Sequence, residues 1–338
     1  MKNIKKKTIL ITGGNGYIGS CLALIAVRKF NIIIIDKNTK NRFIKNKKIL
    51  NIRCNINDAP KLDKILKKFT PDIIIHLAAQ STVDFINLKR QSYLKDNIKG
   101  TKNIIDVCIK NNIKKIIFSS TAAVYKEKNK PLEETDSLKP NNLYGKTKLI
   151  NEKYIQKSLR NKETKYCILR FFNVCSALKK YNIGEFHSPE THLLPKVINA
   201  IANKKIINIY GNNYKTYDGT CVRDFVHIED IVSGILKSIN YLEKNNSSIF
   251  NLGSSNEISV LDIIKKCSKL IKIIPKINVY KRRKGDVSKL ICKIQKAKNK
   301  LKWKPKNSNL SRIISDEIWW LNYLNKKKIK RNILTINN

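Results

Sequence analysis

The sequence predicts an α/β protein built on a doubly wound parallel sheet, with a smaller α/β lobe beside it. Short runs of β-branched residues alternate with longer helical patterns, and these runs are continuously apolar. This rhythm is typical of βαβ units in a sheet that helices cover on both faces. A chain of 338 residues also exceeds the size that one core usually fills, which favours a second lobe.

The elements can be placed along the chain in order. The predicted strands lie at 8–12, 32–36, 49–53, 73–79, 115–120 and 166–171, and the predicted helices at 17–29, 61–69, 92–112 and 143–160. After residue 173 glycines and prolines interrupt shorter elements, so the rhythm weakens. We therefore predict a first lobe of residues 1–175 with about 221–245, a second lobe of 176–220 and 246–325, and a basic tail at 326–338.

The charge of the chain is strongly positive. Lys and Arg number 69 and Asp and Glu 25, which leaves a net charge of +44. This excess fits a nucleic-acid-binding protein, but it also fits compositional drift toward Lys, Asn and Ile. We favour drift because the lysines are spread over the whole chain, so a nucleic-acid partner is not expected. The apolar runs are far shorter than the about 20 residues of a bilayer span, so no membrane partner is expected either.

Eight cysteines are scattered along the chain without a C-x-x-C pair. This pattern predicts reduced structural thiols and a cytoplasmic protein. A second group of possible metal ligands consists of Glu185, His187, Glu190 and His192. Its histidines are five residues apart, which does not place them on one helical face, so we expect no metal.

A glycine-rich loop follows the first predicted strand. The segment TGGNGYIG contains Gly13, Gly16 and Gly19, which allow a tight turn, close approach of a pyrophosphate and close helix packing. Asp36 ends the next strand, where a carboxylate binds ribose hydroxyls and repels a 2′-phosphate. The loop therefore predicts a Rossmann-like site for NAD. Lys37 keeps NADP open as an alternative.

A candidate catalytic pair stands at the start of a predicted helix. Tyr144 and Lys148 are four residues apart, so both side chains project from one face. A phenol is a poor base at neutral pH, and a nearby ammonium favours its ionised form. The preceding predicted strand ends at Ser119, Ser120 and Thr121, on the sheet edge where ligands bind. Tyr and Lys are common in this chain, and it is this context that favours catalysis.

The glycine loop and the catalytic pair are joined by a series of motifs in the second half. These are LRFFN, GEFHSPETHLLP, YG, DGTCVRDFVHIED, FNLG and RRKGD, at 169–173, 184–195, 210–211, 218–230, 250–253 and 282–286. Together they resemble the extended short-chain dehydrogenase/reductase superfamily, and most closely its nucleotide-sugar 4-epimerases. The resemblance runs from about residue 8 to residue 320.

The resemblance implies a role for each matching residue. Tyr144 would be the acid and base, Lys148 would tune it, and Thr121 would bridge it to the substrate. The implied NAD-binding residues are Gly13, Gly16, Tyr17, Ile18, Gly19, Asp36, Ala78, Asn97, Tyr144, Lys148 and Phe172. The implied substrate-binding residues are Thr121, Asn173, His192, Leu193, Tyr210, Arg223, Arg283 and Asp286. The first lobe would then bind NAD and the second lobe a nucleotide sugar, in a homodimer formed through the helices near 92–112 and 143–160.

The activity that the resemblance implies is reversible C4 epimerisation of UDP-glucose and UDP-galactose in galactose metabolism. It would proceed through a 4-keto intermediate on tightly bound NAD. Another NAD-dependent nucleotide-sugar epimerase or a dehydratase is an alternative, although dehydratases carry an acidic residue where this chain has Ala122 and Ala123. A nucleic-acid-binding protein on a retired reductase fold is an alternative of another class. Phe171, Ser81 and Asn55 depart from the family pattern at cofactor positions, and Leu290 stands at a position associated with substrate size.

Overall fold

The structure is a computed structural model of the chain. It describes residues 6–38, 43–44, 46–80, 90–187, 190–283 and 285–327. Ser81 and all but the first two residues of the predicted basic tail lie outside the described residues. No helix of the described part has the length and apolar character of a membrane span.

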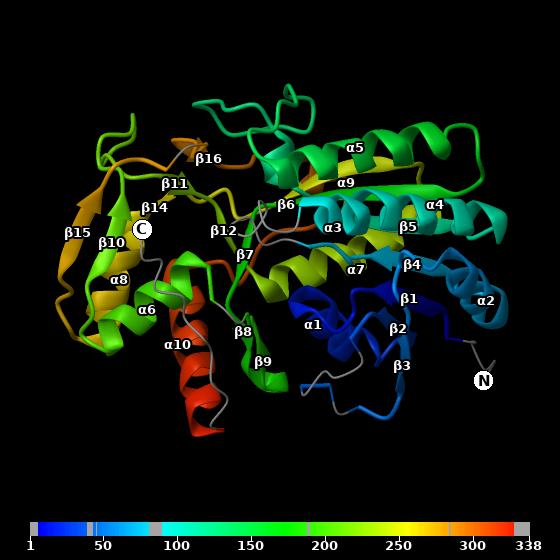
Figure 1. Cartoon of the computed structure of the whole chain (residues 1–338), viewed down its shortest axis with the longest axis horizontal. Helices are drawn as coiled ribbons and strands as arrows, with labels where there is room; N and C mark the ends of the chain where they lie inside the picture. The colour runs from blue at the N-terminus through cyan, green and yellow to red at the C-terminus, as the bar shows by residue number, and fades with distance from the viewer. Residues whose placement is uncertain are drawn as a thin grey trace.

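A seven-stranded parallel sheet forms the centre of the molecule, in the order β13-β6-β5-β4-β1-β2-β3 (Figure 1). Its strands are β1 (Thr8–Thr12), β2 (Asn31–Asp36), β3 (Ile49–Arg53), β4 (Ile73–His76), β5 (Lys115–Thr121), β6 (Lys165–Phe171) and β13 (Ser248–Leu252). The chain builds outward from β1 to β3 and then returns to place β4 beside β1. This reversal of direction is where doubly wound sheets bind ligands, at the carboxyl ends of the strands.

Helices cover both faces of the sheet, because successive side chains of each buried strand point to opposite faces. Ile9 and Ile11 of β1 belong to one core, and Leu10 between them belongs to the other. The first core is closed by α1 (Tyr17–Ala26), α7 (Ile228–Lys244) and α9 (Gln295–Lys300), and the second by α2 (Ala59–Phe69), α4 (Gly100–Lys110) and α5 (Leu143–Ser158). The predicted fold class is confirmed.

Two predicted elements differ from the structure near the carboxyl edge of the sheet. The strand predicted at 73–79 ends at His76, and the helix predicted at 92–112 is divided into α3 (Arg90–Leu94), a π-helical segment (Lys95–Lys99) and α4. The two elements are joined through Asn97, whose side chain accepts from the backbone N–H of Gln80 (2.8 Å) and donates to its carbonyl oxygen (3.0 Å). These bonds tie the loop after β4 to the π-helical segment. Widened helical turns of this kind are frequent at functional sites.

The second lobe lies at one end of the sheet, on the left of Figure 1. Its strand pairs are β8 (Ala177–Leu178) with β9 (Ile183–Gly184), β10 (Ile207–Tyr210) with β15 (Ile277–Tyr280), and β11 (Val222–Arg223) with both β14 (Ile258–Ser259) and β16 (Lys289–Leu290). Its helices are α6 (Leu193–Ala202), α8 (Val260–Ile271) and α10 (Leu310–Lys326). Where the two lobes meet, β7 (Asn173–Cys175) pairs with β12 (Phe225–His227), and their side chains belong to the cores of both lobes.

The predicted boundary of the second lobe is wrong for one part of 246–325. Strand β13 pairs with β6 as the edge strand of the central sheet, and α9 packs on β13. The reason is the apolar burial of Phe250 and Leu252, which extend the core beneath α7. The first lobe therefore continues from α7 through β13, and the chain returns to it at α9 before α10 completes the second lobe.

Candidate active site

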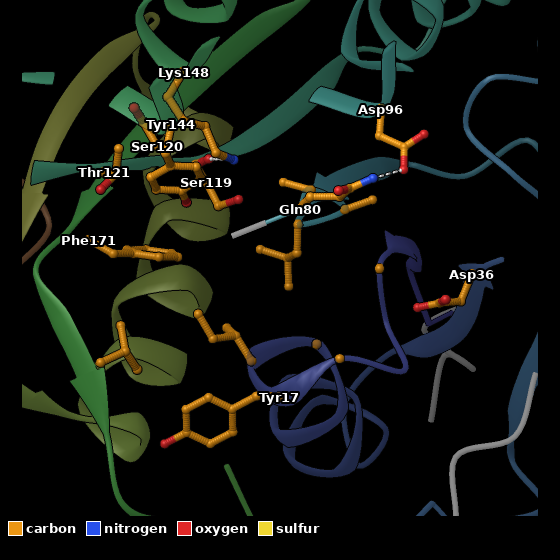
Figure 2. Close-up of a pocket in the computed structure, with 18 of the residues that line it drawn as sticks. Tyr17, Asp36, Gln80, Asp96, Ser119, Ser120, Thr121, Tyr144, Lys148 and Phe171 are labelled. Carbon is orange, nitrogen blue, oxygen red and sulfur yellow. Dashed lines mark hydrogen bonds between the residues drawn. The ribbon is translucent and has the colours of Figure 1, made fainter. Parts of the chain in front are cut away.

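A cavity of about 560 Å³ opens at the carboxyl ends of β1, β2, β4, β5 and β6 (Figure 2). Most of the predicted site residues line it: Gly13, Gly16, Tyr17, Ile18, Gly19, Asp36, Ala78, Thr121, Tyr144, Lys148, Phe172, Asn173 and His192. Tyr144, Lys148 and Thr121 lie at one end of the cavity in Figure 2, and Asp36 lies at the other. The cavity is therefore elongated, with hydroxyl and ammonium groups at one end and a carboxylate at the other.

The glycine loop has the geometry that its sequence predicts. Gly13 has φ +68°, and a Cβ atom there would lie 2.7 Å from the backbone of Ala78. A Cβ atom on Gly19 would lie 2.5 Å from the carbonyl oxygen of Gly13. Helix α1 begins beyond Gly16 with no side-chain cap, so the first-turn N–H groups and the positive end of the helix dipole are available to an anion.

Asp36 is fixed at the far end of the cavity. Its Oδ2 accepts from the backbone N–H of Asn15 (3.1 Å) and its Oδ1 from that of Asn38 (3.0 Å). Lys37 also lines the cavity and contacts Asp96, with 3.3 Å between Nζ and Oδ2. Ile35 and Ile56 add apolar surface nearby. This end of the cavity fits a dinucleotide, because it offers exposed loop backbone and an uncapped helix start to the phosphates and an apolar wall to the base. The Asp36 carboxylate favours NAD over NADP.

Helix α5 places the catalytic pair at the opposite end. The side chain of Asn142 accepts from the backbone N–H of Gly145 (2.8 Å), which caps the helix just before Tyr144. Gly145 allows α5 to approach the loop after β5, because a Cβ atom there would lie 2.2 Å from the Ala123 carbonyl oxygen. Lys148 is buried and donates from Nζ to the carbonyl oxygen of Ser119 (2.7 Å).

The protonation of this pair differs from the expectation in one respect. Burial raises the pKa of the Tyr144 phenol to about 12. Burial also lowers the pKa of Lys148 to about 7, against the opposing charge of Glu152. The ammonium lies 5.7 Å from the centre of the Tyr144 ring. The lysine alone therefore does not lower the pKa of the phenol as the sequence suggests. Burial destabilises the phenolate more than the nearby ammonium stabilises it.

Thr121 ends β5 beside this pair. Its hydroxyl oxygen accepts from the backbone N–H of Ala123 (3.2 Å), so the hydroxyl hydrogen can be donated into the cavity. The next two side chains, Ala122 and Ala123, carry no acid or base. The chemistry that these groups support is proton transfer at a single hydroxyl.

One predicted cofactor residue lies behind the cavity wall. Asn97 is buried and contacts Gln80, and Gln80 with Asp96 lines the cavity in its place. Gln80 donates from Nε2 to Asp96 Oδ2 (2.6 Å), and Asp96 also accepts from Asn57 Nδ2 (2.7 Å). No sequence motif indicates Gln80 or Asp96: Asp96 lies in the π-helical segment, and Gln80 lies in the loop after β4, where it is bonded to Asn97.

Five predicted substrate residues lie outside the cavity lining, in the second lobe: Leu193, Tyr210, Arg223, Arg283 and Asp286. The guanidinium of Arg283 lies 3.9 Å from the centre of the Tyr210 ring, which stacks on Tyr280 at 5.7 Å. Arg223 contacts Asp286, with 3.6 Å between Nη2 and Oδ1. These contacts form a separate group of cationic and aromatic side chains rather than part of the dinucleotide cavity.

The acidic histidine cluster lies where the cavity meets the second lobe. His192 Nδ1 lies 2.9 Å from Glu190 Oε1 and 3.4 Å from Glu185 Oε1. Burial opposes the charge on His192, but these carboxylates outweigh it and raise its pKa to about 9. One ligand atom each from Glu185, His187 and His192 lies within 4.8 Å of the others, the spacing of a possible metal site. The contacts of His192 are those of a protonated imidazole that is paired with the carboxylates of Glu185 and Glu190.

Comparison with known proteins agrees with this geometry. Residues 9–253 match the profile of the NAD dependent epimerase/dehydratase family. The chain is 34% identical over 316 residues to the UDP-glucose 4-epimerase of Halalkalibacterium halodurans, covering 92% of this chain and 95% of the relative. It is 35% identical over 318 residues to the UDP-glucose 4-epimerase of Lacticaseibacillus casei, covering 93% and 96%.

Solved structures agree as well. The UDP-glucose 4-epimerase of Bifidobacterium longum, in complex with NAD⁺ and UDP, matches with a TM-score of 0.86 and 27% identity over 96% of this chain and 99% of that chain. The UDP-glucose 4-epimerase of Brucella ovis in complex with NAD matches with a TM-score of 0.85 and 28% identity, over 92% and 97%. The resemblance seen in the sequence is confirmed. The chain belongs to the NAD-dependent epimerase/dehydratase family.

Proposed function

We propose that this chain catalyses the reversible C4 epimerisation of UDP-glucose and UDP-galactose through a 4-keto intermediate, with tightly bound NAD. The observation that carries the proposal is that Tyr144, Lys148 and Thr121 share one cavity with the glycine loop and Asp36. An acid and base pair thus faces the space that a dinucleotide would fill. The reaction belongs to galactose metabolism.

The protein's part in the chemistry is the movement of one proton. When bound, NAD supplies the acceptor and later the donor of the C4 hydride, and a positive charge beside Tyr144. The Tyr144 oxygen takes the proton of the 4-hydroxyl group, directly or through Thr121, while the C4–H bond breaks and a C4 ketone forms. Lys148 is held by Ser119 and stabilises the phenolate. After the hexose turns, the same proton returns from Tyr144 to the oxygen.

The hexose must turn while its UDP end stays fixed. We assign the UDP end to the residues at the second lobe: Asn173, His192, Leu193, Tyr210, Arg223, Arg283 and Asp286. A guanidinium binds phosphate oxygens through a planar fork, which gives direction as well as charge. The cationic His192 lies where the cavity meets this group. Firm anchoring at the diphosphate and loose contact at the sugar allow both faces of C4 to be presented.

Two alternatives fit the site less well. Loss of water from a hexose needs an acid and a base near C5 and C6, and Ala122 and Ala123 provide neither. Nucleic-acid binding needs exposed cationic and aromatic groups and has no use for a buried Lys148 beside a tyrosine. Another NAD-dependent nucleotide-sugar epimerase differs from the proposal only in the sugar, and Leu290 stands at the position that the family resemblance associates with sugar size.

We also propose a cytoplasmic homodimer. All eight cysteines are free and buried, which suits a reducing compartment. The dimer would form through α4 and α5, which lie side by side and are linked by a hydrogen bond from Tyr154 to Asp106 (2.5 Å). Ile150 on α5 is 44% exposed and would be covered in such a dimer.

The direct test of the activity is incubation of the purified protein with UDP-galactose and NAD, followed by separation of the products. We expect UDP-glucose, and the same equilibrium mixture when the reaction starts from UDP-glucose. Release of a 4-keto-6-deoxy product would instead identify a dehydratase. Salt-dependent retention of RNA without any turnover would favour the nucleic-acid alternative.

Asp36→Asn is expected to weaken selection of NAD against NADP. The variant loses the charge that binds ribose hydroxyls, and a hydrogen bond to a charged group contributes about 1.5–3 kcal/mol, so we expect about 10- to 100-fold less discrimination. The measurement is a titration of the protein with each dinucleotide. Asp106→Asn, which removes an exposed carboxylate on α4, is the matched control. An unchanged ratio of the two dissociation constants in Asp36→Asn would contradict the assignment.

A further inference from the structure

A buried ion pair lies beneath the catalytic helix and takes no part in the mechanism above. Arg170 of β6 is 1% exposed and Glu152 of α5 is fully buried. Arg170 donates from Nη2 to Glu152 Oε2 (2.7 Å) and from Nε to Glu152 Oε1 (3.1 Å). This is a two-point contact between planar groups, which fixes direction as well as distance.

The pair is aligned with the catalytic residues. Glu152 follows Lys148 by four residues and Tyr144 by eight, so all three lie on one face of α5. Glu152 Oε1 also accepts a hydrogen bond from the hydroxyl of Ser120. The adjacent residue, Ser119, provides the carbonyl oxygen that receives the Lys148 ammonium. Ser119 and Ser120 of β5 therefore bond to Lys148 and Glu152, which lie one turn apart on α5.

Arg170 is held from its other side as well. Its Nη1 donates to the Tyr125 hydroxyl oxygen (2.9 Å) and to the Glu134 carbonyl oxygen (3.1 Å), and the Tyr125 hydroxyl donates to Asn251 Oδ1 (2.6 Å). The network thus joins α5, β5, β6 and β13. Well-packed apolar residues often replace a buried ion pair without loss of stability. Stability alone is therefore a weak reason for a charged network at this place.

We propose that Glu152 and Arg170 are positioning residues that fix α5 on the sheet and keep Lys148 charged while Tyr144 exchanges its proton. The inference rests on the proposed function. Neither residue touches the space for substrate or dinucleotide, because neither lines the cavity. They act through Ser119, Ser120 and Lys148.

The groups around Lys148 support this role. Tyr144 and Glu152 face it from its own helix, the Phe118 ring (4.8 Å) and the Ser119 carbonyl from β5, and His76 from β4. Burial lowers the pKa of His76 to about 3, so it is neutral, and burial raises the pKa of the Tyr93 phenol near Tyr144, so it is neutral too. Glu152 opposes the desolvation that lowers the pKa of Lys148.

The test compares single replacements with the double variant Glu152→Gln/Arg170→Met. Each single replacement leaves a lone buried charge, so we expect a large loss of thermal stability. The double variant removes both charges and is expected to fold. Without the carboxylate, Lys148 loses its proton at lower pH, so the basic limb of the kcat profile moves down by about one pH unit or more. KM for UDP-galactose is expected to stay within about twofold.

A readout independent of turnover is the NMR titration of ¹³Cε-labelled lysine, with Lys148 assigned by its loss in Lys148→Arg. The double variant should show the same downward shift there. Asp230→Asn is the control, because it weakens a buried network at residues 306–308, away from the cavity. It should lower stability and leave the Lys148 titration unchanged. A folded double variant with the wild-type titration and basic limb would overturn the inference.

Glu152→Asp keeps the test decisive should the double variant not fold. It retains the charge and shortens the side chain, so the Lys148 titration should stay in place while kcat falls at unchanged KM. Wild-type kcat in Glu152→Asp would overturn the positioning role. Absence of epimerisation by the wild-type protein would refute the proposed function instead, and the NMR titration would still decide whether the pair holds the charge on Lys148.

Discussion

Replacing Tyr144 by Phe is expected to lower kcat by about 10²- to 10⁴-fold, the usual contribution of a positioned acid or base. The ring stays in place, so the cavity keeps its shape, and only the group that takes the 4-hydroxyl proton is lost. NAD and UDP-galactose should bind with little change, so the loss should appear in kcat rather than in KM. The measurement is the initial rate of UDP-glucose formation at saturating substrate.

Tyr154→Phe is the matched control for this replacement. Tyr154 lies on the same helix and also has a hydroxyl group, which contacts Asp106 on the outer surface rather than the cavity. Its removal should leave kcat within about twofold, as expected for a surface change. A Tyr144→Phe variant that turns over at a comparable rate would show that another group moves the proton.

Gly19→Ala is expected to weaken NAD binding by about 10- to 100-fold. The added Cβ atom would lie 2.5 Å from the Gly13 carbonyl oxygen and 2.6 Å from the Gly14 Cα, and both belong to the backbone. The loop must therefore shift away from α1, at a cost of about 1–3 kcal/mol for overpacking. The dissociation constant for NAD and the thermal midpoint should both change.

Gly16→Ala separates the two effects. A Cβ atom there has only the Gly13 carbonyl oxygen nearby, at 3.3 Å, so the loop can keep its shape. It would nevertheless occupy the approach of the pyrophosphate. We expect weaker NAD binding with a nearly unchanged thermal midpoint. Wild-type NAD affinity in Gly19→Ala would mean that the loop does not hold the dinucleotide.

The sheet could be predicted from sequence because its signals are local. Runs such as Ile32–Ile35 are β-branched and continuously apolar, and Asp36 ends its strand as expected. The edge strand β13 was assigned to the wrong lobe because nothing in residues 248–252 indicates which neighbour they pair with. Such pairing is decided by the burial of Phe250 beneath α7, which is a contact between distant segments.

The site was predicted only where a motif carries the chemistry within a few residues. The glycine loop and the four-residue spacing of Tyr144 and Lys148 are such short motifs. Gln80 and Asp96 could not be predicted, because they reach the cavity from two distant segments, the loop after β4 and the π-helical segment, which meet only in the folded chain. The phenol's raised pKa was also beyond the sequence, since it depends on how deeply α5 is packed and not on the neighbouring charge alone.

The most direct measurement of the central claim follows a deuterium atom placed at C4 of UDP-galactose. The proton that Tyr144 takes and returns belongs to the 4-hydroxyl group, whereas the hydrogen at C4 would pass to bound NAD as a hydride and return to the same carbon. We expect UDP-glucose that retains deuterium at C4 by mass spectrometry and NMR, and no uptake at C4 from heavy water. Loss of the label to solvent, or its absence from C4 in UDP-glucose, would contradict the account.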